Sequence, residues 1–528
     1  MTSVSAIDRR VFLQGSGLVL AAPALIGSLG PAWGQGDPFS LGVASGDSLP
    51  DGFVIWTRLA PAPLSSDPNT PGGMSGGDRI IDFEIAADSG MRQIVRRGKA
   101  LAEAIYAYSV HKVVRGLEPG RPYWYRFTSG AASSRIGRAM TMPKAGASVD
   151  RLRFAYVSCS NYELGYFSAY RHLREEAPDF VIFLGDYIYE TVQPEGMTVR
   201  RHFDGVVPKD LADYRHRYEQ YRLDPDLQDM HAAVPAFMTW DDHEVENDYA
   251  DRWGPDFADP KVFLKRRAAA YRAFYEHMPL KPQLSLPHGP DMRVYDRFGF
   301  GDLAQFSLLD GRQYRSREAC WARPDHGGAH QETDVHCPER LDSDRSMLGM
   351  RQEAWLYDGF AKSTARWNVI AQDVLMAHFR EHDRSGEVAY WTDDWNGYPA
   401  ARARLMRHIH DSKLANPVVL SGDIHSFWSN DLHLDADDEG SPVVASEFVG
   451  TSVTSNGPPE KLFGDFVKDN PHVHFFEARK RGYVSVDVTK ERMTTRFQAL
   501  SDVRDPKATV STLKSFVIED GQRGAVAV

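Results

Sequence analysis

The chain has 528 residues, too many for one ordinary hydrophobic core, so we expect two domains, of which one is large. Apolar residues make up 42% and charged residues 25%, and no stretch after the N-terminus supplies the roughly 18 apolar residues that a membrane span needs. The formal net charge of −11, without any run rich in Lys and Arg, argues against a broad nucleic-acid-binding surface.

The N-terminal segment predicts export. Arg9 and Arg10 precede an apolar run over residues 11–26, and Ala32-Trp33-Gly34 follows as a small-x-small cleavage site. We therefore expect residues 1–34 to be a twin-arginine signal peptide, which carries folded protein to the periplasm or out of the cell. The alternative is an ordinary secretory signal with an incidental pair of arginines.

Residues 39–145 show short alternating apolar runs separated by Gly, Pro and Asp, as in 53–56, 80–85 and 123–127. This pattern predicts a small all-β sandwich of the fibronectin III or immunoglobulin type. The turn over 117–120, followed by a Tyr-rich strand, resembles the fibronectin corner in which a Tyr packs at the edge of a sheet. No residue in this segment suggests chemistry, so we expect a structural module.

Residues 150–510 follow a different rhythm and predict an α/β catalytic domain. A buried-type strand at 154–157, an amphipathic helix at 166–176 and a second buried strand at 180–184 form a β-α-β unit. A large mixed sheet is therefore expected. Further elements are predicted as strands at 235–240, 303–309, 368–371, 417–420 and 482–487 and as a helix at 262–278.

Almost every predicted strand of this domain leads into residues that can bind metals. A single Asp after a strand is usually a cap or a turn residue, but open sheets bind ligands at the carboxyl ends of their strands, so recurrence at several ends indicates one shared site. In chain order the ends are Ser158-Cys159-Ser160-Asn161, Gly185-Asp186-Tyr187-Ile188-Tyr189, Asp241-Asp242-His243-Glu244, Asp310-Gly311-Arg312, Gln372-Asp373 and Gly422-Asp423-Ile424-His425.

The residue types at these ends fit two kinds of cation. Gly185 allows a sharp turn that could place Asp186 between two ions. Thiolate, phenolate, carboxylate and imidazole together suit ferric iron, whereas an all-oxygen set suits calcium or magnesium, and the sequence offers both sets. Cys159 lies at a strand end beside Ser and Asn, which favours a ligand over a buried structural thiol. A catalytic Cys nucleophile is the less favoured alternative.

The chain contains three cysteines, so an exported form leaves one thiol without a partner. Cys320 and Cys337 lie close together in a polar stretch over 313–351, which we take as a surface excursion. We expect these two to form a disulfide in an oxidising compartment and Cys159 to stay free.

Taken together, the motifs resemble the alkaline phosphatase D (PhoD) family of calcineurin-like metallophosphoesterases, which is related more distantly to purple acid phosphatases. The resemblance spans nearly the whole chain after the signal segment and implies a four-layer α/β/β/α metallophosphatase sandwich behind the N-terminal all-β domain. The motifs that carry it lie at 39–47, 56–59, 158–161, 185–190, 240–244, 310–315 and 421–425.

The resemblance also implies the cofactors Fe³⁺ and Ca²⁺ and assigns their ligands. Asp186 is the residue expected to bridge the two ions. The implied iron ligands are Cys159, Asp186, Tyr189 and His425, and the implied calcium ligands are Asp186, Asp242 and Asp423, with Asn247 as a further candidate.

Two further residues match positions that contact the phosphoryl group in related enzymes. His243 is implied to touch the phosphoryl group, and Arg312 to hold one of its non-bridging oxygens. The alternative for Arg312 is a salt bridge with Asp310 in the same turn. Many metallophosphatases carry another ligand His near the end of the 368–371 strand, but here the first His in that region is His378.

The function implied is that of an exported alkaline phosphatase that hydrolyses phosphomonoesters, with phosphodiesters as a further substrate class, by attack of a metal-held hydroxide in order to scavenge phosphate. The expected partners are small phosphoesters and the twin-arginine export machinery, with no nucleic acid, no membrane span and a monomeric state. One alternative is a phospholipase D-type phosphodiesterase on the same site. A non-catalytic surface binding protein is the alternative from a different class.

Overall fold

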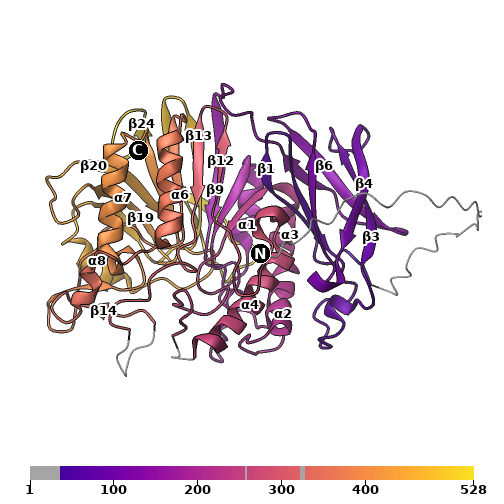
Figure 1. Cartoon of the computed structure of the whole chain (residues 1–528), viewed down its shortest axis with the longest axis horizontal. Helices are drawn as coiled ribbons and strands as arrows, with labels where there is room; N and C mark the ends of the chain where they lie inside the picture. Colours follow the sequence, from indigo (N-terminus) through magenta and orange to yellow (C-terminus); the bar gives the residue numbers. More distant parts are fainter. Residues whose placement is uncertain (1–35, 256–258, 322–327) are drawn as a thin grey trace, which may run out of the picture.

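We describe the protein from a computed structural model, in which residues 36–255, 259–321 and 328–528 are described (Figure 1). The predicted signal peptide, residues 1–34, lies outside these ranges. Among the described residues, no helix combines the length and the apolar character needed to cross a membrane.

The larger sheet contains ten strands within the described residues and runs through both parts of the chain. Strands β9, β10 and β11 pair in parallel at its centre, so their carboxyl ends lie at one edge. From one side to the other, the strands are β25 (Val526–Ala527), β24 (Val510–Glu519), β23 (Arg492–Leu500), β22 (Gly482–Thr489), β9 (Arg151–Val157), β10 (Phe180–Leu184), β11 (Ala236–Thr239), β1 (Val43–Leu49), β2 (Gly52–Arg58) and β5 (Ser109–Arg115).

The second sheet belongs entirely to the predicted catalytic domain. Strands β13, β15, β18 and β20 pair in parallel in that order, and antiparallel strands flank them. The strand order is β12 (Asp296–Phe300), β13 (Ala304–Leu308), β15 (Trp367–Ala371), β18 (Pro417–Ser421), β20 (Val443–Val449), β19 (Phe427–His433) and β21 (Val473–Glu477).

The two sheets face each other across an aromatic core. The ring of Phe154 on β9 stacks on Phe180 at 5.5 Å and meets the edge of Phe306 on β13 at 5.2 Å. Strand β10 reads Phe-Val-Ile-Phe-Leu and is buried at every position, as expected for a parallel strand covered on both faces. Each fully buried aromatic or aliphatic side chain contributes about 1.5–3 kcal/mol to this packing.

Helices cover the outer face of each sheet and complete the four layers that the family resemblance implies. The larger sheet is covered by α1 (Ser168–Glu176), α2 (Leu211–Arg222), α3 (Pro225–Ala233) and α4 (Pro260–His277), and the second sheet by α6 (Gly349–Lys362), α7 (Pro399–Asp411) and α8 (Glu460–Val467). The short helix α5 (Pro282–Ser285) follows α4. Figure 1 shows α6 and α7 on the side of the molecule opposite the N-terminal strands.

The N-terminal strands form a β-sandwich of two sheets, one of which is the end of the ten-stranded sheet that continues into the catalytic region. The separate sheet is made of β4 (Ile94–Ala102), β3 (Arg79–Ala86), β6 (Pro122–Ser129) and β7 (Ala132–Ser133), with β8 (Gly137–Met140) also on β6. It packs on β1, β2 and β5 through apolar residues such as Phe53 and Phe83. The Tyr123 hydroxyl accepts from the Glu118 N–H at 3.0 Å, which is the expected tyrosine corner. Strand β1 pairs in parallel with β11, Gly46 beside Ala236.

The polar segment over 313–351 is not simply a surface excursion, and this expectation was wrong for its first part. Arg315 and Glu318 are buried and form a 2.7 Å ion pair. Further along, the segment adds β14 (Gln331–Glu332) to a small sheet with β17 (Val388–Trp391) and β16 (Glu381–His382). Cys320 and Cys337 are joined by a disulfide, in agreement with the expected pairing, and Cys159 is free and buried.

Candidate metal centre

The predicted strand ends converge at the carboxyl edges of the two central parallel sheets, and their backbone is strained there. Cys159, Asp186, Asp423 and His425 all have positive φ angles, of 61°, 52°, 62° and 55°. Residues other than glycine rarely adopt this backbone conformation. Each instance costs on the order of 1–3 kcal/mol and persists only where the surrounding structure enforces it. Such strain concentrates at functional sites, so its repetition at four residues on three strand ends marks this edge as the site.

Gly185 explains how Asp186 reaches its place. Gly185 has φ 104°, and a Cβ added there would lie 2.4 Å from the Cβ of Asp241. Only glycine therefore lets β10 end this close to the end of β11. The turn is held by Glu244, whose carboxylate accepts from the N–H groups of Asp186 at 3.1 Å and Asp241 at 2.9 Å.

The first ligand group combines sulfur, nitrogen and oxygen. Cys159, Asp186 and His425 bring one ligand atom each to within 4.8 Å of the others. The Tyr189 hydroxyl joins them: it donates to Asp186 Oδ2 at 2.7 Å and lies 2.9 Å from His425 Nε2. The four residues predicted to bind iron are thus brought together.

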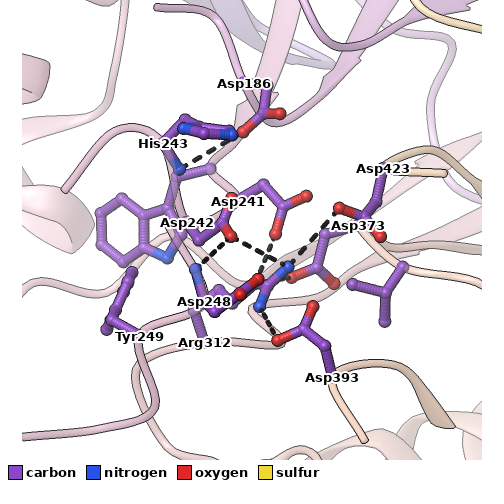
Figure 2. A network of polar contacts seen from close by, with 12 residues as sticks. Asp186, Asp241, Asp242, His243, Asp248, Tyr249, Arg312, Asp373, Asp393 and Asp423 are labelled. Atoms are coloured by element: carbon purple, nitrogen blue, oxygen red, sulfur yellow. Dashed lines mark hydrogen bonds and ion pairs between the residues drawn. The ribbon is translucent and has the colours of Figure 1, made fainter. Parts of the chain in front are cut away.

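The second group is made of carboxylates. One ligand atom each from Asp242, Asp248 and Asp393 lies within 4.8 Å of the others. Asp242 also belongs to a group with Asp186 and His243, so the two ligand groups meet at Asp186 and Asp242. We call the two groups together the crevice, and each group one half of it. Figure 2 shows the carboxylates of Asp241, Asp242, Asp393 and Asp423 around the guanidinium of Arg312, whereas Asp186 lies beside His243.

Arg312 is fully buried and is the counter-charge of this carboxylate group. Its Nη1 lies 2.6 Å from Asp393, its Nη2 lies 3.7 Å from both Asp242 and Asp423, and its Nε binds Asp241 (Figure 2). A salt bridge with Asp310 in the turn is not formed; Asp310 accepts instead from the backbone N–H of Arg312 at 3.1 Å. The turn alternative is therefore wrong.

His243 lies between the two groups and is oriented by Glu190. Its Nδ1 lies 2.6 Å from Glu190 Oε2, and its ring lies over that of Tyr189 at 4.1 Å between centroids. The backbone N–H of His243 donates to Asp186 at 3.3 Å. A carboxylate partner at Nδ1 fixes both the tautomer and the ring plane, which leaves Nε2 for a ligand or substrate.

Burial dominates the electrostatics of the site. It raises the pKa of the Cys159 thiol and of the Tyr189 phenol well above their ordinary values, and the neighbouring carboxylates raise both further. Burial also raises the pKa of Asp186, and it raises the pKa of Asp241 to about 7. The thiol and the phenol would therefore ionise only beside a strongly charged cation, which competes with the proton.

The orphaned polar atoms show that these residues fit metal ions. Within the described part of the chain, Asp241 Oδ2, Asp242 Oδ1 and both carboxylate oxygens of Asp373 are buried without a hydrogen-bond partner. Unpaired buried carboxylate oxygens are costly, and Arg312, even with Arg315 paired to Asp393, cannot neutralise all of the carboxylates of the group. Divalent and trivalent cations satisfy such oxygens directly.

Two predicted positions differ from the rest. Asn247 is exposed, and its backbone N–H donates to Glu190 at 2.9 Å. Its calcium role stays a prediction. His378 lies away from the crevice, in a small cavity with His433 and His472, and therefore does not replace the ligand His absent near 368–371. Asp373 stands at that strand end, 3.8 Å from Arg312.

Sequence reasoning missed three members of the site. Asp248 and Asp393 complete the carboxylate group, and Glu190 holds His243. Asp248 and Asp393 follow no predicted strand, so the strand-end rule could not find them. Glu190 directly follows the Tyr189 motif, and its adjacency to a predicted ligand was an available signal.

Comparisons with known proteins assign the family. The family model of PhoD-like phosphatases matches residues 154–497, and the model of the PhoD-like N-terminal domain matches residues 27–143. Alkaline phosphatase D of Bacillus subtilis (strain 168) is 42% identical over 534 aligned residues, which cover 98% of this chain and 88% of that protein.

Solved structures agree. The structure of PhoD superposes with a TM-score of 0.86 at 42% identity, covering 94% of this chain and 92% of that one. A purple acid phosphatase from yellow lupin (Lupinus luteus) seeds shares the fold at 12% identity, with a TM-score of 0.54 over 92% of this chain and 74% of the other. The chain therefore belongs to the PhoD-like phosphatase family and is a phosphoric ester hydrolase.

Proposed function

We propose that this phosphatase is an exported, metal-dependent alkaline phosphatase that binds Fe³⁺ and Ca²⁺ and scavenges phosphate from small phosphoesters. The observation that carries the proposal is the position of the Tyr189 hydroxyl, 2.7 Å from Asp186 and 2.9 Å from His425, in the group that also includes Cys159. Phenol, thiol, carboxylate and imidazole around one point form a donor set that favours a trivalent iron over calcium.

The ligands would divide between two ions that share Asp186. Cys159, Tyr189 and His425 would complete the iron site, and carboxylates that include Asp242 and Asp423 would complete the calcium site. Bound there, the cations would lower the pKa of a coordinated water and neutralise charge on the phosphoryl oxygens. Asn247 is a further candidate on the calcium side.

His243 and Arg312 are the residues proposed to contact the phosphoryl group. Glu190 holds His243 at Nδ1, so the doubly protonated ring can donate from Nε2 to a phosphoryl oxygen as charge develops. Arg312 uses Nε and Nη1 to bind Asp241 and Asp393, and its Nη2 makes no hydrogen bond within the described residues. Nη2 is thus the atom that can turn to a non-bridging oxygen.

The test is turnover by the purified, metal-loaded enzyme. Hydrolysis of p-nitrophenyl phosphate at alkaline pH is expected, and bis-p-nitrophenyl phosphate measures any diesterase activity in parallel. A clear preference for the bis-ester would replace the monoesterase with the phospholipase D-type alternative. No turnover of either ester by protein with full metal content would overturn the enzymatic proposal and favour a binding protein.

The iron assignment has its own test. Phenolate and thiolate bound to Fe³⁺ give visible charge-transfer bands, so the protein is expected to be coloured as purified and to be bleached by dithionite. Elemental analysis should find iron and calcium together. Colourless, fully active protein without iron would refute the ferric assignment and leave the phosphatase standing.

Export is proposed from Arg9 and Arg10 in the sequence of residues 1–34. Changing both to Lys should trap the precursor in the cytoplasm, because the twin-arginine route reads this pair. Unchanged export of the Lys-Lys variant would leave the ordinary secretory route instead.

A further inference from the structure

A cavity of about 630 Å³ lies beside the metal-ligand crevice. Asp423, a predicted calcium ligand, lines it together with the next residue, Ile424. Asp394 also lines it, and the preceding residue, Asp393, binds Arg312 in the crevice. The cavity and the crevice therefore share a wall, and a group attached to a phosphorus atom held at the ligands could extend into the cavity.

Two elements that play no part in the metal site form the other walls. Helix α8 contributes Leu462, Phe463 and Phe466, and the small sheet contributes Trp391 on β17. Leu462 is 49% exposed and Trp391 39% exposed. Large apolar side chains left open around a cavity of this size are typical of a site that binds an organic group.

The charged groups of the cavity act against an anionic occupant. Glu381 and Asp383 line it in addition to Asp394 and Asp423, against the single guanidinium of Arg384 and the imidazole of His382. Asp383 is held in its turn by the N–H groups of Ser385 at 2.8 Å and Glu387 at 3.0 Å, and Glu381 accepts from Gln331 at 2.7 Å. Burial raises the pKa of Glu381 to about 7, whereas hydrogen bonds in its turn lower the pKa of Asp383. Both are therefore ionised at the alkaline pH of the proposed reaction, so a negatively charged group entering the cavity would be repelled.

We propose that this cavity binds the organic part of the phosphoester and selects an apolar group that carries no negative charge. Trp391, Leu462 and Phe463 are the specificity-determining residues, and Asp423 marks the junction with the phosphoryl site. The inference rests on the proposed function, because it places the phosphoryl group at the metal ligands. It goes further in naming the substrate class: esters of aromatic or alkyl alcohols in preference to esters of hydroxy acids.

The experiment compares three esters with the metal-loaded full-length enzyme: phenyl phosphate, 4-tert-butylphenyl phosphate and 4-carboxyphenyl phosphate. The tert-butyl group makes the phenol a slightly poorer leaving group, so a faster reaction cannot come from leaving-group chemistry. We expect kcat/KM for the tert-butyl ester to exceed that for phenyl phosphate by about tenfold, as apolar groups of this size give in enzyme pockets. The carboxy ester should be slower than phenyl phosphate.

Variants connect this preference to the cavity. Trp391→Ala and Leu462→Ala should each reduce, several-fold, the ratio of kcat/KM for the tert-butyl ester to kcat/KM for phenyl phosphate. Leu462→Lys should raise the rate with the carboxy ester. Val262→Ala, at a 59% exposed position on α4, is the matched control and should change no ratio. Equal rates for the three esters, or ratios unchanged in both cavity variants, would overturn the inference.

A binding measurement separates this inference from the phosphatase proposal. Calorimetric titration of 4-tert-butylphenol into the enzyme should show one saturable site, weakened about tenfold in Trp391→Ala and unchanged in Val262→Ala. Binding with this dependence but without turnover of any ester would support the cavity and overturn the phosphatase. Turnover of all three esters without binding of 4-tert-butylphenol would support the phosphatase and overturn the inference about the cavity.

Discussion

The two halves of the crevice differ in the atoms they offer to a cation. The half around Cys159 and Tyr189 combines sulfur, phenol and imidazole, whereas the half around Asp242 and Asp393 offers carboxylate oxygens around Arg312, with Arg315 also paired to Asp393. Both are buried to a similar degree. The difference teaches that burial alone does not define a metal site: the donor types decide which cation each half can hold, and Asp186 couples the halves.

The largest effect is expected from the residue that both halves share. In the proposed assignment Asp186 binds both ions, so Asp186→Asn should lower kcat/KM for p-nitrophenyl phosphate on the order of 10³-fold or more and reduce both iron and calcium content. Asp411→Asn, on the last turn of α7 and away from the crevice, is the control and should keep full activity. Loss of only one metal in Asp186→Asn would show that the halves are independent.

Arg312→Met tests the carboxylate half through stability. The substitution leaves several buried carboxylates without their counter-charge, so chelator-treated protein should lose about 3–5 kcal/mol of unfolding free energy in urea titrations. Added calcium should restore part of this loss, because the ion replaces the missing charge.

Arg252→Met is the matched control, since the Arg252 side chain is 57% exposed and pairs with its neighbour Asp251 at 3.0 Å. It should cost less than about 1 kcal/mol. If the Arg312 variant were no less stable than this control in chelator, the guanidinium would not be the counter-charge that its position indicates.

Tyr189→Phe and Cys159→Ser test the other half. Each should shift or remove the visible band and lower activity on the order of 10²-fold, because each removes one anionic ligand but leaves Asp186 in place. Calcium content, measured in the same samples, should stay near the wild-type value. An unshifted band in both variants would remove them from the iron site.

Glu190→Gln should have the smallest effect, because Glu190 acts through His243 and is a positioning residue. We expect kcat to fall about 10- to 100-fold with little change in KM and no change in the visible band. The Gln amide oxygen can still accept from the Asn247 N–H, so thermal stability should hardly change. A lost band would mean that Glu190 supports the iron ligands rather than the histidine.

Much of the fold was predictable because buried strands are short apolar runs with polar ends. The strand expected at 180–184 is found as β10 over Phe180–Leu184, and the helix expected at 262–278 is found as α4 over Pro260–His277. The grouping of Cys159, Asp186, Tyr189 and His425 was predictable for the same reason, since each lies just after such a run. Their assignment to iron came from the family resemblance and stays a proposal. Helix α2 was missed because its buried face carries Tyr, Arg, Glu and Gln rather than an apolar stripe. Helix α3 was also missed, although Leu227 and Met230 are buried on it.

What could not be predicted depends on contacts between distant segments. Asp393 lies in a loop after β17, and only the folded chain brings it 2.6 Å from Arg312. The burial of Arg315 within a polar stretch was likewise unexpected. One of its partners, Glu318, is close in the chain, but the other, Asp393, is distant in the sequence. A sequence pattern describes neighbours in the chain, and these residues owe their roles to neighbours in space.

The pairing of β1 with β11 has a consequence for the order in which the protein folds. On a growing chain, Gly46 emerges long before its partner Ala236, so β1 remains an open edge until the central strands of the catalytic region have been made. Unpaired edges of this kind recruit other chains and lead to aggregation. The N-terminal segment therefore depends on the rest of the chain for the pairing of β1 with β11. A fragment that ended near residue 145 would expose this strand edge and would tend to aggregate rather than behave as an independent module.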